Sequence, residues 1–162
     1  MKRLWLAVLL LASPVMAEVP FSTAFSGIWH GVGIQVDAQD WPMELRLSPD
    51  GAAVEYASLD CGGTWDYLRM DEAQILAVER ITYGLEECLD GGLVRLQAYG
   101  DGMLLYLWFD NNSNPVAAAV LIEGAMRMEN YDALLRLTLE AVGKGFVKGP
   151  EGADVSVGEI KT

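Results

Sequence analysis

The sequence predicts an all-β fold, an eight-stranded antiparallel up-and-down barrel with a C-terminal helix. Short apolar stretches recur from residue 26 to residue 123, and turn residues separate them every eight to twelve positions, a spacing typical of β-sandwiches and β-barrels. Apolar and polar residues alternate within these stretches, as Leu45 and Leu47 do around Arg46, so each strand has one dry and one wet face. Two cysteines lie in connections that a meander brings to one end. These observations favour one sheet that closes on itself.

The chain begins with a segment, 1–17, that has the pattern of a secretory signal peptide. Two basic residues precede an apolar run over 4–12, and small residues follow up to Ala17. The run is shorter than the roughly 20 residues that cross a bilayer, so a retained membrane anchor is the weaker alternative. We expect a periplasmic or secreted protein with no membrane span after signal removal, in which 18–25 leads into the folded domain.

The domain is expected over 26–143. Its eight strands are expected at 26–36, 42–48, 52–58, 63–70, 74–83, 92–99, 102–109 and 115–123. The connections between them are rich in glycine, proline, asparagine and aspartate, which favour tight reversals.

A helix is expected after the last strand. Asn130 is a suitable N-cap, and Gly143 and Gly145 end the helix. The apolar stripe expected to face the barrel comprises Tyr131, Leu134, Leu135 and Val142. The remaining segment, 144–162, is expected to be a flexible glycine-rich tail.

Cys61 and Cys88 are the only cysteines, and in an exported chain a disulfide is the default. They fall in the connections after the third and the fifth strand, which a meander places at the same end. A bridge requires Cα atoms within roughly 7 Å and would stabilise the fold by roughly 3–4 kcal/mol in the chain-entropy model. A zinc site or a reactive thiol is less favoured, because His30 is the only histidine.

The net charge of the chain limits the classes of molecule that it can bind. Eleven basic residues face twenty-three acidic ones, which gives a formal net charge of −12. Such a surface repels nucleic acid and anionic membranes and attracts cationic partners. Solubility alone is the simpler explanation of the charge.

No catalytic or metal motif is found in the sequence, and we expect a protein that is not an enzyme and has no cofactor. His30 is the only candidate base for a hydrolytic triad. The adjacent carboxylates of Glu86 and Glu87 are interpreted as part of a solvated loop and not as a catalytic pair. The segment 110–114 begins like a calcium loop, but Pro115 and Leu121 occupy the positions where such a loop needs glycine and glutamate. A hairpin turn is the better interpretation.

Two sets of residues resemble known families. Gly27-Ile28-Trp29 resembles the glycine-x-tryptophan signature of lipocalins, which implies an indole that closes one end of an eight-stranded barrel and a helix after the last strand. A second pattern resembles a poorly characterised β module of bacterial extracytoplasmic proteins, without a firmly assigned activity. It comprises Trp41-Pro42-Met43, Tyr56-Ala57-Ser58-Leu59-Asp60-Cys61-Gly62-Gly63, Glu79-Arg80-Ile81 with Gly84, Cys88-Leu89-Asp90-Gly91-Gly92 and Leu105-Tyr106-Leu107-Trp108.

Binding is the function that the sequence leaves open. Eight-stranded barrels hold one small ligand at the open end, and the candidate ligand-binding residues are Trp29, Tyr56, Trp65, Glu79 and Trp108, with Tyr67 and Phe109 as further aromatic side chains. Glu79 shares a strand face with apolar residues, and a buried carboxylate needs a partner. Arg46, Arg69 and Arg95 are the candidates, and both a structural ion pair and a ligand anchor remain open.

Two functions follow as hypotheses. The first is a non-catalytic, lipocalin-like binding module for a small apolar or amphipathic ligand, which requires an internal cavity of at least a few hundred Å³ and not an interior filled by side chains. The second is an interaction or inhibitor protein whose acidic rim binds a cationic envelope protein such as a lysozyme. The acids expected at the disulfide-bearing rim are Asp37, Asp40, Asp60, Glu86, Glu87, Asp90 and Asp110, against Asp50, Asp71, Glu72 and Asp101 at the opposite end.

Overall fold

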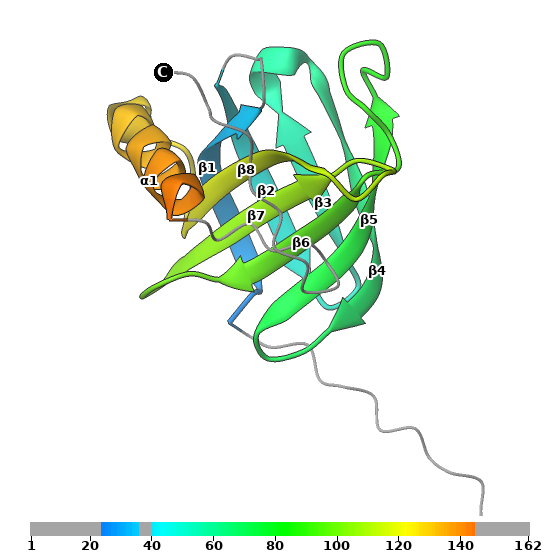
Figure 1. The fold of residues 1–162 in the computed structure, drawn as a ribbon, viewed down its shortest axis with the longest axis horizontal. Helices are drawn as coiled ribbons and strands as arrows, with labels where there is room; N and C mark the ends of the chain where they lie inside the picture. The colour runs from blue at the N-terminus through cyan, green and yellow to red at the C-terminus, as the bar shows by residue number, and fades with distance from the viewer. Residues whose placement is uncertain (1–23, 36–39, 145–162) are drawn as a thin grey trace, which may run out of the picture.

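A computed structural model of the protein describes residues 24–35 and 40–144, and it is the closed antiparallel barrel that the sequence predicts (Figure 1). The strands follow one another around the barrel in chain order, and β1 closes it by pairing with β8. The strands are β1 (Gly27–Gln35), β2 (Trp41–Ser48), β3 (Gly51–Tyr56), β4 (Cys61–Met70), β5 (Gln74–Tyr83), β6 (Leu93–Ala98), β7 (Met103–Phe109) and β8 (Pro115–Glu123). Each expected boundary lies within two residues of the observed one, because the turn residues fix where strands end.

Several expectations concern residues outside those that the structure describes. The signal peptide at 1–17, most of the lead at 18–25 and almost all of the tail at 144–162 fall there. Within the described residues, no helix is long and apolar enough to cross a membrane.

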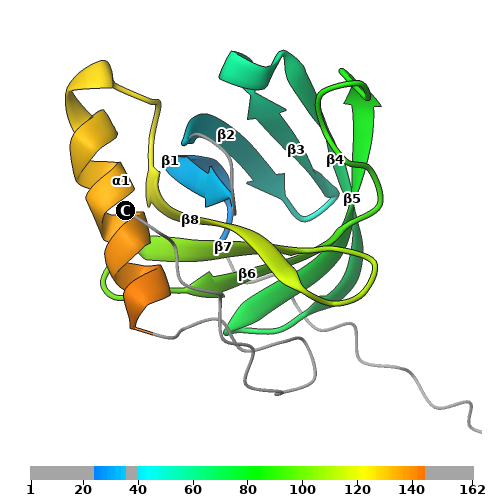
Figure 2. The ribbon, with the colours of Figure 1, turned by 45° about the horizontal axis from the view of Figure 1, so that its top comes forward.

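Alternation along the strands sorts the apolar side chains into two clusters. On β7, Tyr106 and Trp108 belong to the cluster inside the barrel, whereas Leu107 and Phe109 belong to a second cluster on its outside. The outer cluster is covered by the helix α1 (Tyr131–Gly143), which lies along the outside of the barrel beside β1 and β8 (Figures 1 and 2).

A threonine attaches α1 to the seam between β1 and β8. The fully buried Thr138 hydroxyl donates to the carbonyl oxygen of Val32 at 2.9 Å and accepts from the amide nitrogen of Val120 at 2.8 Å. Val32 and Val120 are register partners across the seam. The predicted helix is confirmed, and Leu134 of the expected stripe is buried, but the sequence pattern did not mark Thr138 as part of that buried face.

The two ends of the barrel differ. At the end where β1 begins, the Trp29 indole is buried and donates to the carbonyl oxygen of Phe25 at 3.0 Å. We call this the closed end. At the other end, the predicted disulfide joins Cys61, which begins β4 just after the short helix η1 (Ala57–Leu59), to Cys88 in the loop 84–92, and the two Cα atoms are 6.3 Å apart. We call this end, with Asp40 and loops 57–60, 84–92 and 110–114, the disulfide rim.

Candidate functional site

A small cavity opens at the disulfide rim and reaches into the barrel. Its volume is about 80 Å³, below the few hundred Å³ expected from the sequence for an internal ligand, because aromatic, leucine and methionine side chains fill the rest of the interior. Its lining comprises the buried Trp41, Tyr56, Glu79, Tyr106 and Trp108, and the outer residues Gln35, Leu59, Glu87, Cys88, Leu89, Val116 and Ala117. The expectation of a wide internal cavity is therefore wrong.

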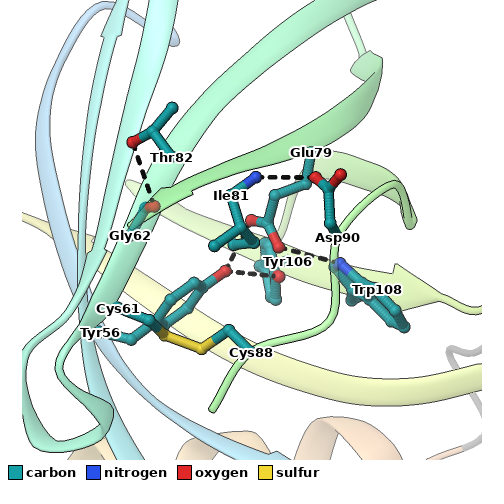
Figure 3. The surroundings of a disulfide bond; sticks show 10 residues. All are labelled: Tyr56, Cys61, Gly62, Glu79, Ile81, Thr82, Cys88, Asp90, Tyr106 and Trp108. Carbon is teal, nitrogen blue, oxygen red and sulfur yellow. Dashed lines mark hydrogen bonds between the residues drawn. A yellow bond between two sulfur atoms is a disulfide. The ribbon is translucent and has the colours of Figure 1, made fainter. Parts of the chain in front are cut away.

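Glu79 forms the polar centre of the site. It lies on β5 in the same inward register as Ala77 and Ile81 and is only 2 % exposed, as strand alternation predicts. Its Oε1 accepts hydrogen bonds from Tyr56 Oη at 2.7 Å and Trp65 Nε1 at 3.1 Å. Its Oε2 accepts one from Trp108 Nε1 at 3.0 Å (Figure 3).

The expected arginine partners of Glu79 are wrong. Arg46 pairs with Glu44 at 2.6 Å and Arg69 pairs with Asp71 at 3.0 Å, and both arginines are largely exposed. Arg95 lies over the Phe109 ring at 5.5 Å, and Phe109 belongs to the outer cluster. The physical reason is strand parity, because each of these arginines occupies an outward position.

The hydroxyl groups form a directed chain that ends on the carboxylate. Tyr56 Oη has one proton, which it donates to Glu79, so at 2.9 Å it accepts from Tyr106 Oη. Burial raises the pKa of both tyrosines well above the ordinary value, which keeps them protonated. Burial also raises the pKa of Glu79, against the lowering effect of its three hydrogen bonds.

Trp41 stands at nearly a right angle to two other aromatic rings of the site, Tyr56 and Tyr106. Trp41 stands edge-on to Tyr56, with 5.1 Å between ring centroids and an interplanar angle of 90°, and edge-on to Tyr106 at 6.5 Å. Trp65 stacks behind Tyr106 at 6.1 Å. Trp41 Nε1 is buried and has no hydrogen-bond partner among the described residues.

Two glycines make room for the cavity tryptophans. A Cβ atom on Gly33 would lie 2.2 Å from the ring of Trp41, and one on Gly92 would lie 1.9 Å from the ring of Trp108. Gly33 is the register partner of Trp41 across β1 and β2. The indoles therefore lie flat against bare backbone.

The structure brings most of the sequence-predicted site residues together. Tyr56, Glu79 and Trp108 line the cavity, and Trp65 supports it from behind through its bond to Glu79. Trp29, by contrast, lies at the closed end and does not line the cavity. It stands at the start of β1, whereas the cavity adjoins the end of that strand.

Two of the other aromatic candidates also lie away from the cavity, and two cavity residues were missed. Phe109 packs in the outer cluster, and Tyr67 donates to the carbonyl oxygen of Ser48 near the β2–β3 turn. The missed residues are Trp41 and Tyr106. Tyr106 was detectable, because it is two positions before Trp108 and so shares its face.

The other polar groups singled out in the sequence serve local structure. His30 is buried away from the cavity and donates from Nδ1 to the carbonyl oxygen of Gly124. Asp110 accepts hydrogen bonds from Asn112 and Asn114, which confirms a hairpin turn at 110–114. Across residues 24–35 and 40–144, no cluster of three metal-ligating side chains is found.

The surface around the cavity is acidic. Among its described residues the disulfide rim contains no lysine or arginine. Its acidic residues are Asp40, Asp60, Glu86, Glu87, Asp90 and Asp110, while Asp37 lies outside the described part of the chain. Two wider hollows, of about 270 and 510 Å³, share the exposed Arg46, Ala53 and Thr64 and open on the outer face of β2–β4.

Comparison with protein-family models, with curated proteins and with solved structures found no match.

Proposed function

We propose that the protein is an exported, non-catalytic binding module that takes one end of a small amphipathic molecule at the disulfide rim. The observation that carries the proposal is the cavity of about 80 Å³, which has a hydrogen-bonded carboxylate at its base and leucines at its edge. Its size suits a headgroup and not a whole ligand, since an engineered cavity that binds benzene measures about 150 Å³.

The edge of the cavity supports an apolar contact outside it. Leu89 lines the opening and is 66 % exposed, and Leu85 in the same loop is 60 % exposed. Exposed apolar side chains beside a polar pocket are typical of ligand-binding surfaces. The apolar part of the ligand would lie across this loop, because the filled interior offers no space for it.

The proposal is tested by locating the binding of six-carbon amphiphiles with two-dimensional NMR of the isotopically labelled protein. The expected result is a saturable shift of amide signals from Gln35, Leu89 and Val116, with closed-end signals unchanged. Ala117→Phe, which fills the opening, should abolish the shifts. Ala53→Phe on the exposed outer face is the matched control. Shifts spread over the whole surface, or none, would contradict the proposal.

A second function, binding of a cationic envelope protein such as a lysozyme, is favoured by the acidic rim. The rim acids are exposed or half-buried, and apart from Arg80 of β5, which interacts with Asp66 and Asp90, no basic side chain is described beside them. They would therefore steer a basic protein toward the opening. Association with a lysozyme should then weaken steeply between low salt and 0.5 M salt. Binding of a lysozyme that does not depend on the salt concentration would contradict this second function.

A further inference from the structure

We infer that the headgroup taken into the cavity is an organic ammonium, held by the Glu79 carboxylate and the faces of the surrounding aromatic rings. This inference rests on the proposed function and specifies its ligand class. Three independent features of the site support it.

The first feature is a buried acid without a basic partner. All three groups that bond Glu79 are neutral donors, Tyr56, Trp65 and Trp108. Among the described residues no lysine, arginine or histidine forms an ion pair with it. Buried carboxylates in proteins are ordinarily paired with a cation, and here the cavity is the space from which a cation would reach it.

The second feature is the arrangement of π faces. Trp41, Tyr56, Tyr106 and Trp108 all line the cavity together with Glu79, and the edge-on contacts of Trp41 leave rings facing the space from different directions. Ring faces carry negative quadrupole charge, and cages of this kind recognise alkylated ammonium groups. An anionic headgroup would face both the carboxylate and these ring faces.

The third feature is incomplete hydrogen bonding in the cavity wall. Oε1 of Glu79 accepts two hydrogen bonds, whereas Oε2 accepts one, which leaves acceptor capacity for an ammonium N–H. Trp41 Nε1 is a buried donor without a partner among the described residues, although buried donors are nearly always bonded. A ligand with an oxygen near its nitrogen would satisfy it.

The rim adds long-range attraction. Six acidic residues lie in the disulfide rim where the cavity opens, and Glu87 lines the cavity itself. The described residues of the rim include no lysine or arginine, and the nearby Arg80 of β5 interacts with Asp66 and Asp90. Clefts bordered by one sign of charge concentrate ions of the opposite sign. The field outside the cavity and the carboxylate at its base therefore select for the same charge.

Four probes with the same six-carbon chain test the inference by isothermal titration of the full chain. They are hexylammonium, hexyltrimethylammonium, hexanol and hexyl sulfate. Both ammonium probes should bind at least about tenfold more tightly than hexanol, which is the order of a cation–π contact combined with a buried charge. Hexyl sulfate should bind most weakly.

The Glu79→Gln variant removes the charge and keeps the size. It should weaken both ammonium probes several-fold, toward the affinity of hexanol, and leave hexanol unchanged, because the ring faces remain; Glu55→Gln on an exposed strand position is the matched control for net charge. If hexanol binds as tightly as the ammonium probes to the native chain, the ammonium inference is overturned while the binding function stands. If no probe binds, the proposed function itself fails. The ranking on the native chain decides the question even if Glu79→Gln does not fold.

Discussion

Two buried tryptophans show how the ends of the barrel differ. Trp29 at the closed end is 4 % exposed and its indole donates to the carbonyl oxygen of Phe25 at 3.0 Å. Trp41 at the disulfide rim is 5 % exposed, and its indole nitrogen has no partner among the described residues. Burial is the same, but among the described residues only the Trp29 indole has a hydrogen-bond partner.

The same contrast extends to the surroundings of the two indoles. The closed end is sealed by Phe25 and the end of the apolar cluster inside the barrel. The disulfide rim has an open cavity, exposed leucines and a covalent bridge. The bridge supplies at the rim a constraint that packing supplies at the closed end.

Removing the disulfide should have the largest effect on stability. We expect the double substitution Cys61→Ala and Cys88→Ala to lower the free energy of unfolding by about 3–4 kcal/mol, because the bridge closes a separation of 27 residues. Urea denaturation followed by tryptophan fluorescence measures it. A variant as stable as the native protein would mean that the rim is held by packing after all, and the contrast between the ends would be lost.

Matched substitutions of the two tryptophans sharpen the comparison directly. Trp29→Phe leaves the Phe25 carbonyl without its donor and should cost about 1–3 kcal/mol more than Trp41→Phe. Trp41→Phe removes a nitrogen that bonds nothing among the described residues. Both substitutions delete a similar ring volume, so the difference in urea midpoint reports the hydrogen bond. Equal costs would show that Trp41 is satisfied in solution.

The pH dependence of stability should reveal the acid at the cavity base. Because burial raises the pKa of Glu79 in the folded state, the folded protein binds the proton more tightly than the unfolded chain does. Its contribution is therefore complete below the ordinary glutamate pKa and is lost as the pH rises through the raised folded value.

Glu79→Gln should flatten this part of the profile when unfolding is measured from pH 4.5 to pH 8. Asp71 and Asp110 have lowered pKa values because of their local hydrogen bonds, so any slope that they add is confined to the region near and below the ordinary aspartate pKa and has the opposite sign. An unchanged slope in the variant would show that another group titrates there.

Exposed rim charges should have the smallest effect, confined to binding kinetics. Asp60→Asn with Glu86→Gln should slow association of hexyltrimethylammonium at low salt and leave its dissociation rate unchanged, since both acids are exposed and neither lines the cavity, and exposed charges act mainly by steering. Asp50→Asn with Glu72→Gln at the closed end is the control. Stopped-flow fluorescence measures both rates. Equal slowing by the two pairs would show that only net charge matters.

Most of the fold was predictable from local chemistry. The boundaries of all eight strands follow from turn residues, and the facing of Glu79 follows from alternation with Ala77 and Ile81. The disulfide followed from the meander, since alternate turns lie at the same end. These features depend on periodicity and chain order, which a sequence contains.

The site was only partly predictable, because it depends on neighbours that are distant in sequence. Arg46 could have been excluded as a partner of Glu79, since it alternates with the buried Leu45 and Leu47. Strand direction could also have placed Trp29 at the end of the barrel away from the cavity, because Trp29 stands at the start of β1. By contrast, the hydrogen bonds of Glu79 to Trp65 and Trp108 and the volume of the cavity depend on barrel shear and ring rotamers, which strand periodicity does not determine.

The Thr138 hydroxyl between β1 and β8 makes the helix part of barrel closure. It takes the place of a direct ladder bond between the Val32 carbonyl and the Val120 amide. A chain shortened before α1 would expose this gap together with the apolar side chains of Phe109 and Val120. The strands on either side of this gap stay paired, so loss of the helix would leave a closed barrel with one unsatisfied carbonyl, one unsatisfied amide and an exposed apolar patch, which favours association between molecules.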